Sequence, residues 1–342
     1  MPSRRAFTPT IFLAFGLVVM FAVYILLGSY TVTIPDFFTI VISHLTGGAK
    51  IPGASFIVME HKLPRAMVGV LIGVAFGLAG ALFQTMLRNP LASPDIIGIS
   101  YGASAAAVTA IVVFGASGAV ISGAAFVGAL AVAAVIYAIS RPGSGGSRGN
   151  AAGNRLVLAG VGIAAALHAV VNFLMTRADI RTASDALVWL NGSLNTANWE
   201  RTGILLIALL VLVPAVVVLA GPLRILELGD DTAAGLGVKV NSTRLGLVLT
   251  AVGLAAVATA AAGPVAFVAF LAGPIARRVV RKPSLPASAL TGALIVLAAD
   301  FFASNIAPVM LDGTVLPVGV ITGALGAPFL LWLLLTSNRK EA

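Results

Sequence analysis

Charged residues are scarce in this chain: Asp, Glu, Lys and Arg together make up 10% of its 342 residues. Soluble globular domains carry about 25% charged residues, so the composition excludes that class. Hydrophobic residues reach 59%, and the mean hydropathy is +1.05. A helix that crosses a bilayer needs about 20 apolar residues and uses about 34 with its connection, so the chain has room for about ten such helices.

Cysteine is absent, which excludes disulfide bonds, thiolate metal ligands and a cysteine nucleophile. A phosphate-binding loop of the form Gly-x-x-x-x-Gly-Lys-Ser/Thr is absent too, because none of the five lysines follows such a loop. No carboxylate pair and no serine motif has catalytic spacing. We therefore expect no enzyme activity, no catalytic residue, no metal site and no cofactor bound by this chain.

Histidine is rare as well, and His44, His61 and His168 lie too far apart to share a ligand. We expect His44 and His61 in a loop on the outer side of the membrane. His168 falls within an apolar stretch. A hydrogen-bonded interior group is the favoured interpretation of His168, and a residue of a transport pathway is the alternative.

Ten apolar stretches account for most of the chain, so we predict a single all-α transmembrane domain over residues 1–342 with about ten helices. The stretches are residues 10–30, 63–87, 97–115, 119–140, 154–176, 201–221, 242–262, 266–279, 285–304 and 315–336. The eighth is too short to cross the membrane at about 1.5 Å per residue. We expect it to be a half-helix or to be shielded by its neighbours.

Basic residues are distributed unevenly over the connections between these stretches. If both termini are cytoplasmic, 15 of the 21 Lys and Arg residues lie on the cytoplasmic side and 6 on the other. An excess of Lys and Arg marks cytoplasmic loops. We therefore predict a multi-pass membrane protein with both termini in the cytoplasm. The sequence pI of about 10.6 reports this topology and not nucleic-acid binding.

A short acidic segment at about residues 228–238 separates two apolar stretches that are each long enough to cross the membrane. Its composition predicts a short helix, and a small, smooth helix at the membrane surface suits docking into a groove on another protein. The expected features are an acidic cap at Asp230 or Asp231, outward-facing Ala233 and Ala234, and an end at Gly235 or Gly237.

Small residues recur on the second apolar stretch at Gly69, Gly73, Gly77 and Gly80, with the spacing i, i+4, i+8 and i+11. In lipid, helices approach closely through such faces because backbone contact gains dispersion energy. We expect this stripe to pack against neighbouring helices rather than to contact a substrate.

Two further features concern the connections and the membrane interior. Pro90 and Pro94 predict a sharp turn after the second stretch, with Ser93 or Asp95 capping the next helix. Asp300 is the one acid that we place inside an apolar stretch. We expect it near the outer end, where it caps a helix or pairs with Arg65, and a proton relay is the alternative.

Several blocks of the chain resemble the iron-siderophore and vitamin B12 permeases, the membrane subunits of ten-helix ABC importers. The resemblance runs from about residue 10 to residue 336. The blocks are Lys62-Leu-Pro-Arg65, Gly80-Ala-Leu-Phe-Gln84, Arg88-Asn-Pro-Leu-Ala-Ser-Pro-Asp95, Gly98-Ile-Ser-Tyr-Gly102, Gly229-Asp-Asp-Thr-Ala-Ala-Gly-Leu-Gly-Val238 and Leu316-Pro-Val-Gly-Val-Ile-Thr-Gly-Ala-Leu-Gly-Ala-Pro328.

The resemblance implies a dimer with an identical or related permease, two ATPase subunits beneath it and an extracytoplasmic binding protein above it. ATP and magnesium would bind to the ATPase. Lys62 and Arg65 match docking positions for the binding protein, since cations at the outer mouth register an acidic partner; anchoring of a helix end is the alternative for Arg65. The residues implied to contact the ATPase are Gly229, Asp230, Asp231, Thr232, Ala233, Ala234, Leu236 and Gly237.

Two positions depart from the family pattern. The block Leu271-Ala-Gly-Pro-Ile-Ala-Arg277 lacks a histidine that the family usually has, and its proline, Pro274 after Gly273, is shifted. Ser304 stands where many members have arginine, so we do not expect a third docking cation. The outer connection from Asn305 to Val315 also looks longer than usual.

The cargo that the resemblance implies is a ferric siderophore, and the segments Gly229-Asp-Asp-Thr-Ala233 and Trp189-Leu-Asn-Gly-Ser-Leu194 look most like permeases for the catecholate kind. Heme or vitamin B12, imported by the same mechanism, is the alternative. An ion-coupled secondary transporter is a rival of another class, which needs charges and broken helices within the membrane.

Overall fold

The structure is a computed structural model that describes residues 4–28, 30–48, 51–95, 98–140 and 150–337. Within these ranges all regular secondary structure is helical. The elements are α1 (Arg4–Leu26), α2 (Ile34–Thr46), α3 (Ala54–Phe56), the π-helix η1 (Ile57–Lys62), α4 (Leu63–Met86), α5 (Ile99–Val112), α6 (Ala119–Ser140), α7 (Asn150–Arg177), α8 (Ile180–Leu190), α9 (Trp199–Leu226), α10 (Asp230–Gly235), α11 (Val240–Ala262), α12 (Val268–Val280), α13 (Leu285–Phe301), the π-helix η2 (Phe302–Ile306), α14 (Ala307–Met310) and α15 (Val318–Ser337).

A helix lies over each of the ten apolar stretches. Among the described residues, seven helical stretches are long and apolar enough to cross a membrane. Helices α5, α12 and α15, with 14, 13 and 20 residues, cover the other three stretches. The expectation for the eighth stretch is confirmed: α12 has 13 residues, most of them buried, and it packs between α4 and α13.

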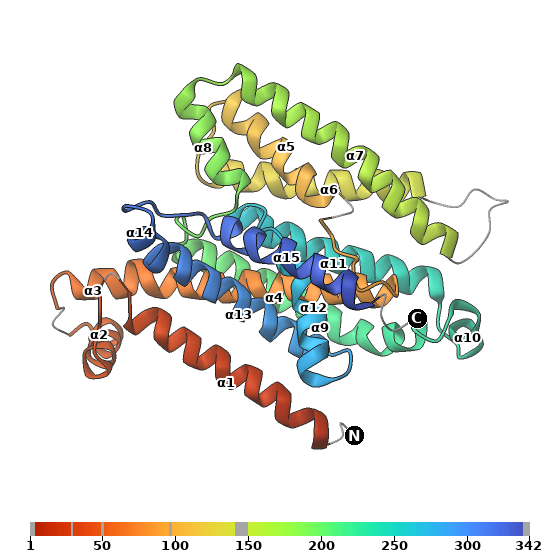
Figure 1. Cartoon of the computed structure of the whole chain (residues 1–342), viewed down its shortest axis with the longest axis horizontal. Coiled ribbons are helices and arrows are strands. Elements are labelled where there is room, and N and C mark those ends of the chain that lie inside the picture. Colours follow the sequence, from red (N-terminus) through yellow and green to blue (C-terminus); the bar gives the residue numbers. More distant parts are fainter. Residues whose placement is uncertain (1–3, 29, 49–50, 96–97, 141–149, 338–342) are drawn as a thin grey trace.

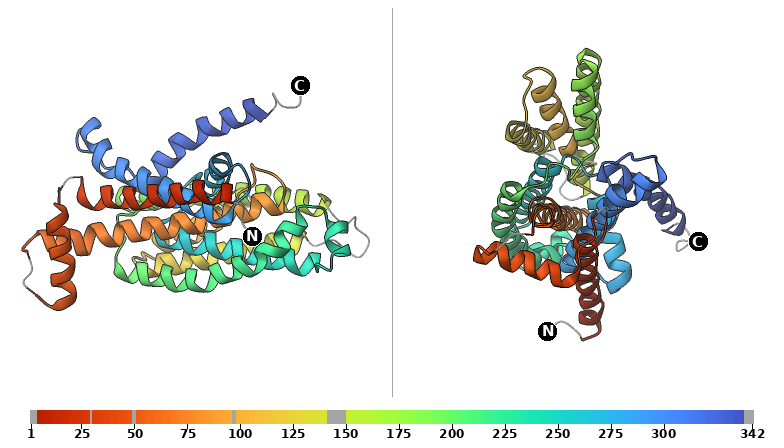
Figure 2. Two further views of the ribbon diagram at one scale, coloured as in Figure 1. Left: turned by 90° about the horizontal axis from the view of Figure 1, so that it is seen from below. Right: turned by 90° about the vertical axis from the view of Figure 1, so that its left-hand side faces the viewer.

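The long helices lie roughly along one axis, which gives the bundle two ends (Figure 1). We name them after elements that lie there: the α10 end, and the opposite α2 end, where α3, α8 and α14 also lie. Helix α4 occupies the centre, in contact with α9, α11, α12 and α13. The end-on view in Figure 2 shows the other helices around it.

The glycine stripe explains how α4 comes to be so closely surrounded. A Cβ atom on Gly73 or Gly77 would lie 2.5 Å or less from backbone atoms of α13, and one on Gly80 would lie 1.8 Å from the carbonyl oxygen of Ala269 in α12. Such distances leave room for hydrogen alone. At Gly69 the nearest atom, at 3.2 Å, is the flexible end of the Leu194 side chain. Three of the four glycines thus meet neighbouring backbones.

The shifted proline of α12 has a local structural partner. Pro274 has no N–H, so the carbonyl of Phe270 one turn earlier lacks its helical donor. The Nε2 group of the buried Gln84 side chain donates to that carbonyl at 3.1 Å. Gly273 leaves the space for it, because a Cβ there would lie 1.9 Å from the Gln84 side-chain oxygen.

Several expectations about connections are wrong. The segment that holds His44 and His61 is no loop: His44 lies in α2 and His61 in η1, which joins directly to α4. The connection from Asn305 to Val315 begins as helix, in η2 and α14, and its extra length stays a prediction. Neither Ser93 nor Asp95 caps α5. Its N-cap is Gly98 at φ 85°, a left-handed conformation that favours glycine.

Candidate functional site

The acidic segment forms α10 at one end of the bundle, between α9 and α11 (Figure 1). Its N-cap is Gly229 at φ 115°, with no side-chain cap, so the expected aspartate cap is wrong. Asp230 and Asp231 instead occupy the first turn, where negative charge interacts favourably with the helix dipole. At the other end Gly237 is left-handed, at φ 85°.

Two hydrogen bonds close that C-terminal end. The amide of Val238 donates to the carbonyl of Ala233, and the amide of Gly237 donates to that of Ala234. This is the Schellman pattern, which favours glycine at its left-handed position. Gly237 therefore ends the helix as expected, whereas Gly235 lies inside its last turn.

Two arginines from other elements hold α10 in place. Arg244 of α11 donates to the Asp230 carboxylate at 2.8 Å. Arg88 donates to the carbonyl of Leu226 at 2.7 Å and lies 3.6 Å from the same carboxylate. Arg88 follows α4 in a left-handed conformation at φ 51°, which turns its side chain back to α10. Sequence reasoning missed both arginines. Arg88 is 138 positions from Leu226, and Arg244, only 14 positions from Asp230, comes close through the turn between α10 and α11.

The two alanines of α10 face different ways. Ala233 is 0% exposed and belongs to the main hydrophobic core, whereas Ala234 is exposed. The expectation that both face outward is wrong for Ala233, because it packs under the helix. We define the α10 surface as the exposed residues of this segment: Leu228, Asp231, Thr232, Ala234, Gly235, Leu236 and Gly237. It is small, with two exposed leucines flanking a flat centre.

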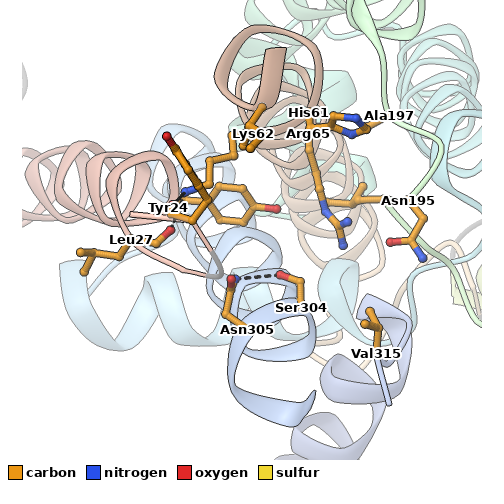
Figure 3. A pocket seen from close by; sticks show the side chains of 13 residues that line it. Tyr24, Leu27, His61, Lys62, Arg65, Asn195, Ala197, Ser304, Asn305 and Val315 are labelled. Atoms are coloured by element: carbon orange, nitrogen blue, oxygen red, sulfur yellow. Dashed lines mark hydrogen bonds between the residues drawn. The ribbon is translucent and has the colours of Figure 1, made fainter. Parts of the chain in front are cut away.

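The α2 end of the bundle contains a polar cavity of about 460 Å³. It lies where α1, η1, α4, η2 and the connection after α8 meet. Figure 3 shows the side chains that surround it. Its polar lining includes Tyr24, His61, Lys62, Arg65, Asn195 and Ser304.

Beside this cavity Arg65 and Asp300 form a bidentate ion pair. Arg65 Nε lies 2.7 Å from one carboxylate oxygen and Nη2 lies 2.8 Å from the other. The Tyr24 hydroxyl donates to the same carboxylate. The Asp300 side chain is 1% exposed and that of Arg65 is 21% exposed. The expected pairing is thus confirmed, and it joins α1, α4 and α13.

Lys62 also binds within the fold. Its ammonium group donates to the carbonyls of Ile25 and Leu27 at 2.9 and 2.8 Å, and to that of Tyr30. These carbonyls lie at the C-terminal end of α1, where a cation complements the helix dipole. Lys62 and Arg65 therefore share the cavity wall, and each has intramolecular partners. Docking of a partner by these two residues stays a prediction.

Other residues singled out from the sequence lie elsewhere. Ser304, at the departure from the family pattern, donates to the backbone carbonyl of Asp300 at 2.7 Å, so it adds no charge to the cavity. His168 is exposed on α7 beside the ring of Tyr101, and its expected interior position is wrong. Burial raises the pKa of the Asp95 carboxyl, although the Ser100 hydroxyl donates to it and opposes the shift.

Comparisons with known proteins agree on one family. The model of the FecCD transport family matches residues 16–336. The ferric enterobactin transport system permease protein FepG of Escherichia coli is 38% identical over 289 residues, which cover 84% of each chain. The Fe(3+)-citrate import system permease protein YfmE of Bacillus subtilis is 38% identical, also with 84% of each covered. The achromobactin transport system permease protein CbrC of Dickeya dadantii is 40% identical, over 83% of this chain and 80% of CbrC.

A solved structure shares the fold. It is described as an inward-facing conformation of a putative metal-chelate type ABC transporter. The TM-score is 0.80, with 96% of this chain and 98% of that chain covered. Sequence identity is 23%, so this likeness speaks for the fold alone.

Proposed function

Because this chain belongs to the FecCD transport family, we propose that it is the permease subunit of an ATP-driven importer that brings a ferric siderophore across the cytoplasmic membrane. The observation that carries the proposal is a match over nearly the whole chain to permeases that are named for iron-chelate transport. Seven helices long and apolar enough to span the bilayer, among the described residues, support it.

The cargo is proposed at the level of a ferric chelate. Relatives of nearly equal identity are named for enterobactin, citrate and achromobactin, so overall similarity does not separate these cargoes. Catecholate selectivity remains a prediction. None of these names favours heme or vitamin B12. Ion coupling has little support, since Asp300, the buried acid of the described spans, already pairs with Arg65.

We propose ten membrane crossings, with both termini and α10 in the cytoplasm and the α2 end outside. The short helices α5 and α12 then cross within the bundle, as the burial of α12 against α4 and α13 illustrates. Helix α15, with 20 residues, crosses at its edge. The distribution of basic residues supports this orientation. Arg88 and Arg244 lie beside α10, and α12 ends with Arg277 and Arg278.

The α10 surface is proposed as the contact with an ATPase subunit. It is exposed, its centre at Ala234 and Gly235 is flat, and the charge of Asp231 lies in the first turn of the helix. Asp230 of α10 forms ion pairs with Arg88 and Arg244. A displacement of α10 would therefore be transmitted to α11 and to the turn after α4. ATP and magnesium would bind the ATPase, and this chain would supply no catalytic group. The remaining partners are a second permease, identical or related, and an extracytoplasmic binding protein.

The cavity at the α2 end is proposed as the place where the binding protein docks, through Lys62 and Arg65. Arg65 keeps 21% of its side chain exposed toward the cavity while bound to Asp300. Its charge is therefore partly neutralised before docking. An acidic group of the partner would compete with Asp300 for the guanidinium.

Substitution of Ala234 tests the ATPase contact. Ala234→Trp adds a bulky group to the centre of the α10 surface, where the structure has space, so folding should be retained. Tagged protein is purified from gently solubilised native membranes, and the bound subunits are identified by mass spectrometry. We expect the wild-type chain to bring down an ATPase subunit, and the variant to lose it together with ferric-siderophore uptake.

Ala134→Trp is the matched control, since Ala134 is an exposed alanine on α6, away from α10. This control should retain the ATPase. A wild-type chain that brings down no ATPase would contradict the proposed importer. An Ala234→Trp variant that still binds the ATPase would contradict the α10 contact alone. ATP hydrolysis by the purified chain without partners would also count against the proposal.

A further inference from the structure

Helix α2 differs from every long helix in its direction. It runs crosswise at the α2 end of the bundle, as the perpendicular views in Figures 1 and 2 show. It begins eight residues after α1 ends at Leu26, so it starts at the level where α1 leaves the apolar core. Its ends are well defined, by Thr33 as N-cap and by Gly47 at φ 72° as C-cap. A capped helix in this position lies along the membrane plane.

The residues of α2 divide into three sectors at about 100° per residue. One sector packs on the protein: Ile40 is buried, and Phe37 and Val41 pack in the cluster with Val58. A second sector is exposed and apolar, with Ile34, Phe38, Ile42 and Leu45 each between 57% and 77% exposed. A third sector carries the polar residues Asp36, Thr39, Ser43 and Thr46.

Three sectors of this kind match three surroundings. A helix that lies on the surface of a membrane, beside a protein, meets protein, lipid and water on different sides. If water covered both free sides of α2, polar residues would be expected on both. Four exposed apolar residues instead form one stripe with the spacing i, i+4, i+8 and i+11, apart from the polar sector. We therefore propose that α2 is an interfacial helix, whose stripe of Ile34, Phe38, Ile42 and Leu45 inserts into the membrane.

The neighbouring surface supports lipid as the occupant rather than another protein. The exposed face of α1, with Phe12, Phe15 and Val18, is apolar along a helix that is long enough to span the bilayer. Phe37 of α2 packs in the cluster that holds Tyr24 and Ile25 of α1, so α2 adjoins this helix. The stripe is thus continuous with a lipid-facing surface.

Spin labelling tests this placement directly, and the absence of cysteine from the chain removes any background. Single substitutions Phe38→Cys and Ile42→Cys label the stripe, and Thr39→Cys and Thr46→Cys are the matched controls in the polar sector. The full-length labelled proteins are reconstituted into vesicles of phosphatidylethanolamine and phosphatidylglycerol. Paramagnetic resonance then measures collision of each label with oxygen, which concentrates in lipid, and with a water-soluble nickel chelate.

We expect the ratio of oxygen to nickel accessibility to be severalfold higher at Phe38 and Ile42 than at Thr39 and Thr46. Nickel accessibility at all four sites would overturn the proposal, because the stripe would then face water. Shielding of the stripe from both reagents would also overturn it, and would indicate a protein partner or a second copy. Leu45→Cys gives a third stripe position if either of the larger substitutions disturbs folding. These outcomes do not depend on the ATPase contact, so they test α2 separately from the proposed function.

Discussion

The ion pair between Arg65 and Asp300 makes a quantitative prediction about stability. Each partner is removed in turn: Arg65→Gln removes the guanidinium and shortens the side chain, and Asp300→Asn removes the charge at nearly constant shape. The pair is unequal, since the side chain of Asp300 is 1% exposed and that of Arg65 is 21% exposed. The cost of each substitution therefore depends on which group is left behind.

After Arg65→Gln, the Asp300 carboxylate stays buried and keeps the Tyr24 hydroxyl as its side-chain donor. Loss of one partner of a buried ion pair typically costs about 3–5 kcal/mol, and we expect a value in that range. After Asp300→Asn, the guanidinium can still reach water through the cavity. We therefore expect a loss of about 1–3 kcal/mol.

The measurement is denaturant unfolding of the purified protein in detergent, followed by tryptophan fluorescence. The double variant completes a thermodynamic cycle, and we expect it to cost less than the sum of the single variants, with a coupling of about 1–3 kcal/mol. Fluorescence-detected gel filtration serves as the control that all variants are folded. An Asp300→Asn variant less stable than Arg65→Gln would refute the reasoning, since burial would then not decide the cost.

Three further predictions concern the helices themselves. Gly80→Ala places a Cβ 1.8 Å from the Ala269 oxygen, where ordinary contact begins at 3.4 Å, so α12 must move by about 1.6 Å. We expect the free energy of unfolding, measured with denaturant, to fall by about 1–3 kcal/mol or more. The control Gly69→Ala should lower it much less. Gln84→Leu leaves the Phe270 carbonyl without a donor and should lower the free energy of unfolding by about 1–3 kcal/mol. Pro274→Ala in the same background restores a helical N–H and should reduce that loss. Absence of this rescue would contradict the hydrogen bond between Gln84 and Phe270. Hydrogen bonds from Thr182 and Arg181 hold the pKa of the N-cap Asp179 below its ordinary value. Its contribution to the stability of α8 is therefore present above the unfolded pKa of about 3.9 and is lost as the pH falls through the folded pKa. The melting temperatures of wild type and Asp179→Asn should converge in that pH range, and a constant difference would show that Asp179 does not act through its charge.

Much of the fold was predictable because its signals are local. The length of an apolar run decides whether a helix forms and how far it extends in lipid, so helices lie over all ten stretches. The spacing of Gly73, Gly77 and Gly80 places them on one helical face, and their contact with neighbouring backbones follows from the lack of a side chain. Gly237 ends α10 because a left-handed turn favours glycine.

The candidate site was less predictable, because it depends on the rotation of helices and on contacts between distant segments. Nothing local distinguishes Ala233 from Ala234, yet the first is buried in the core and the second is exposed, since adjacent residues of a helix differ by about 100° in direction. The sequence predicts a loop where α2 lies. The exposed apolar stripe and the polar sector of α2 together resemble neither a membrane span nor a buried amphipathic helix.

The sequence by itself determined that this chain is a helical membrane protein of a transport family, with a short helix between two long ones, because apolar run lengths and family motifs are read along the chain. Packing chose between the two alternatives for Asp300, which pairs with Arg65, and added the unpredicted hydrogen bond from Tyr24. Tyr24 and Asp300 are 276 positions apart, and Arg65 and Asp300 are 235 apart. Side chains at such separations come together when α1, α4 and α13 pack side by side. Glycine contacts between α4 and α13 determine how closely those two helices approach.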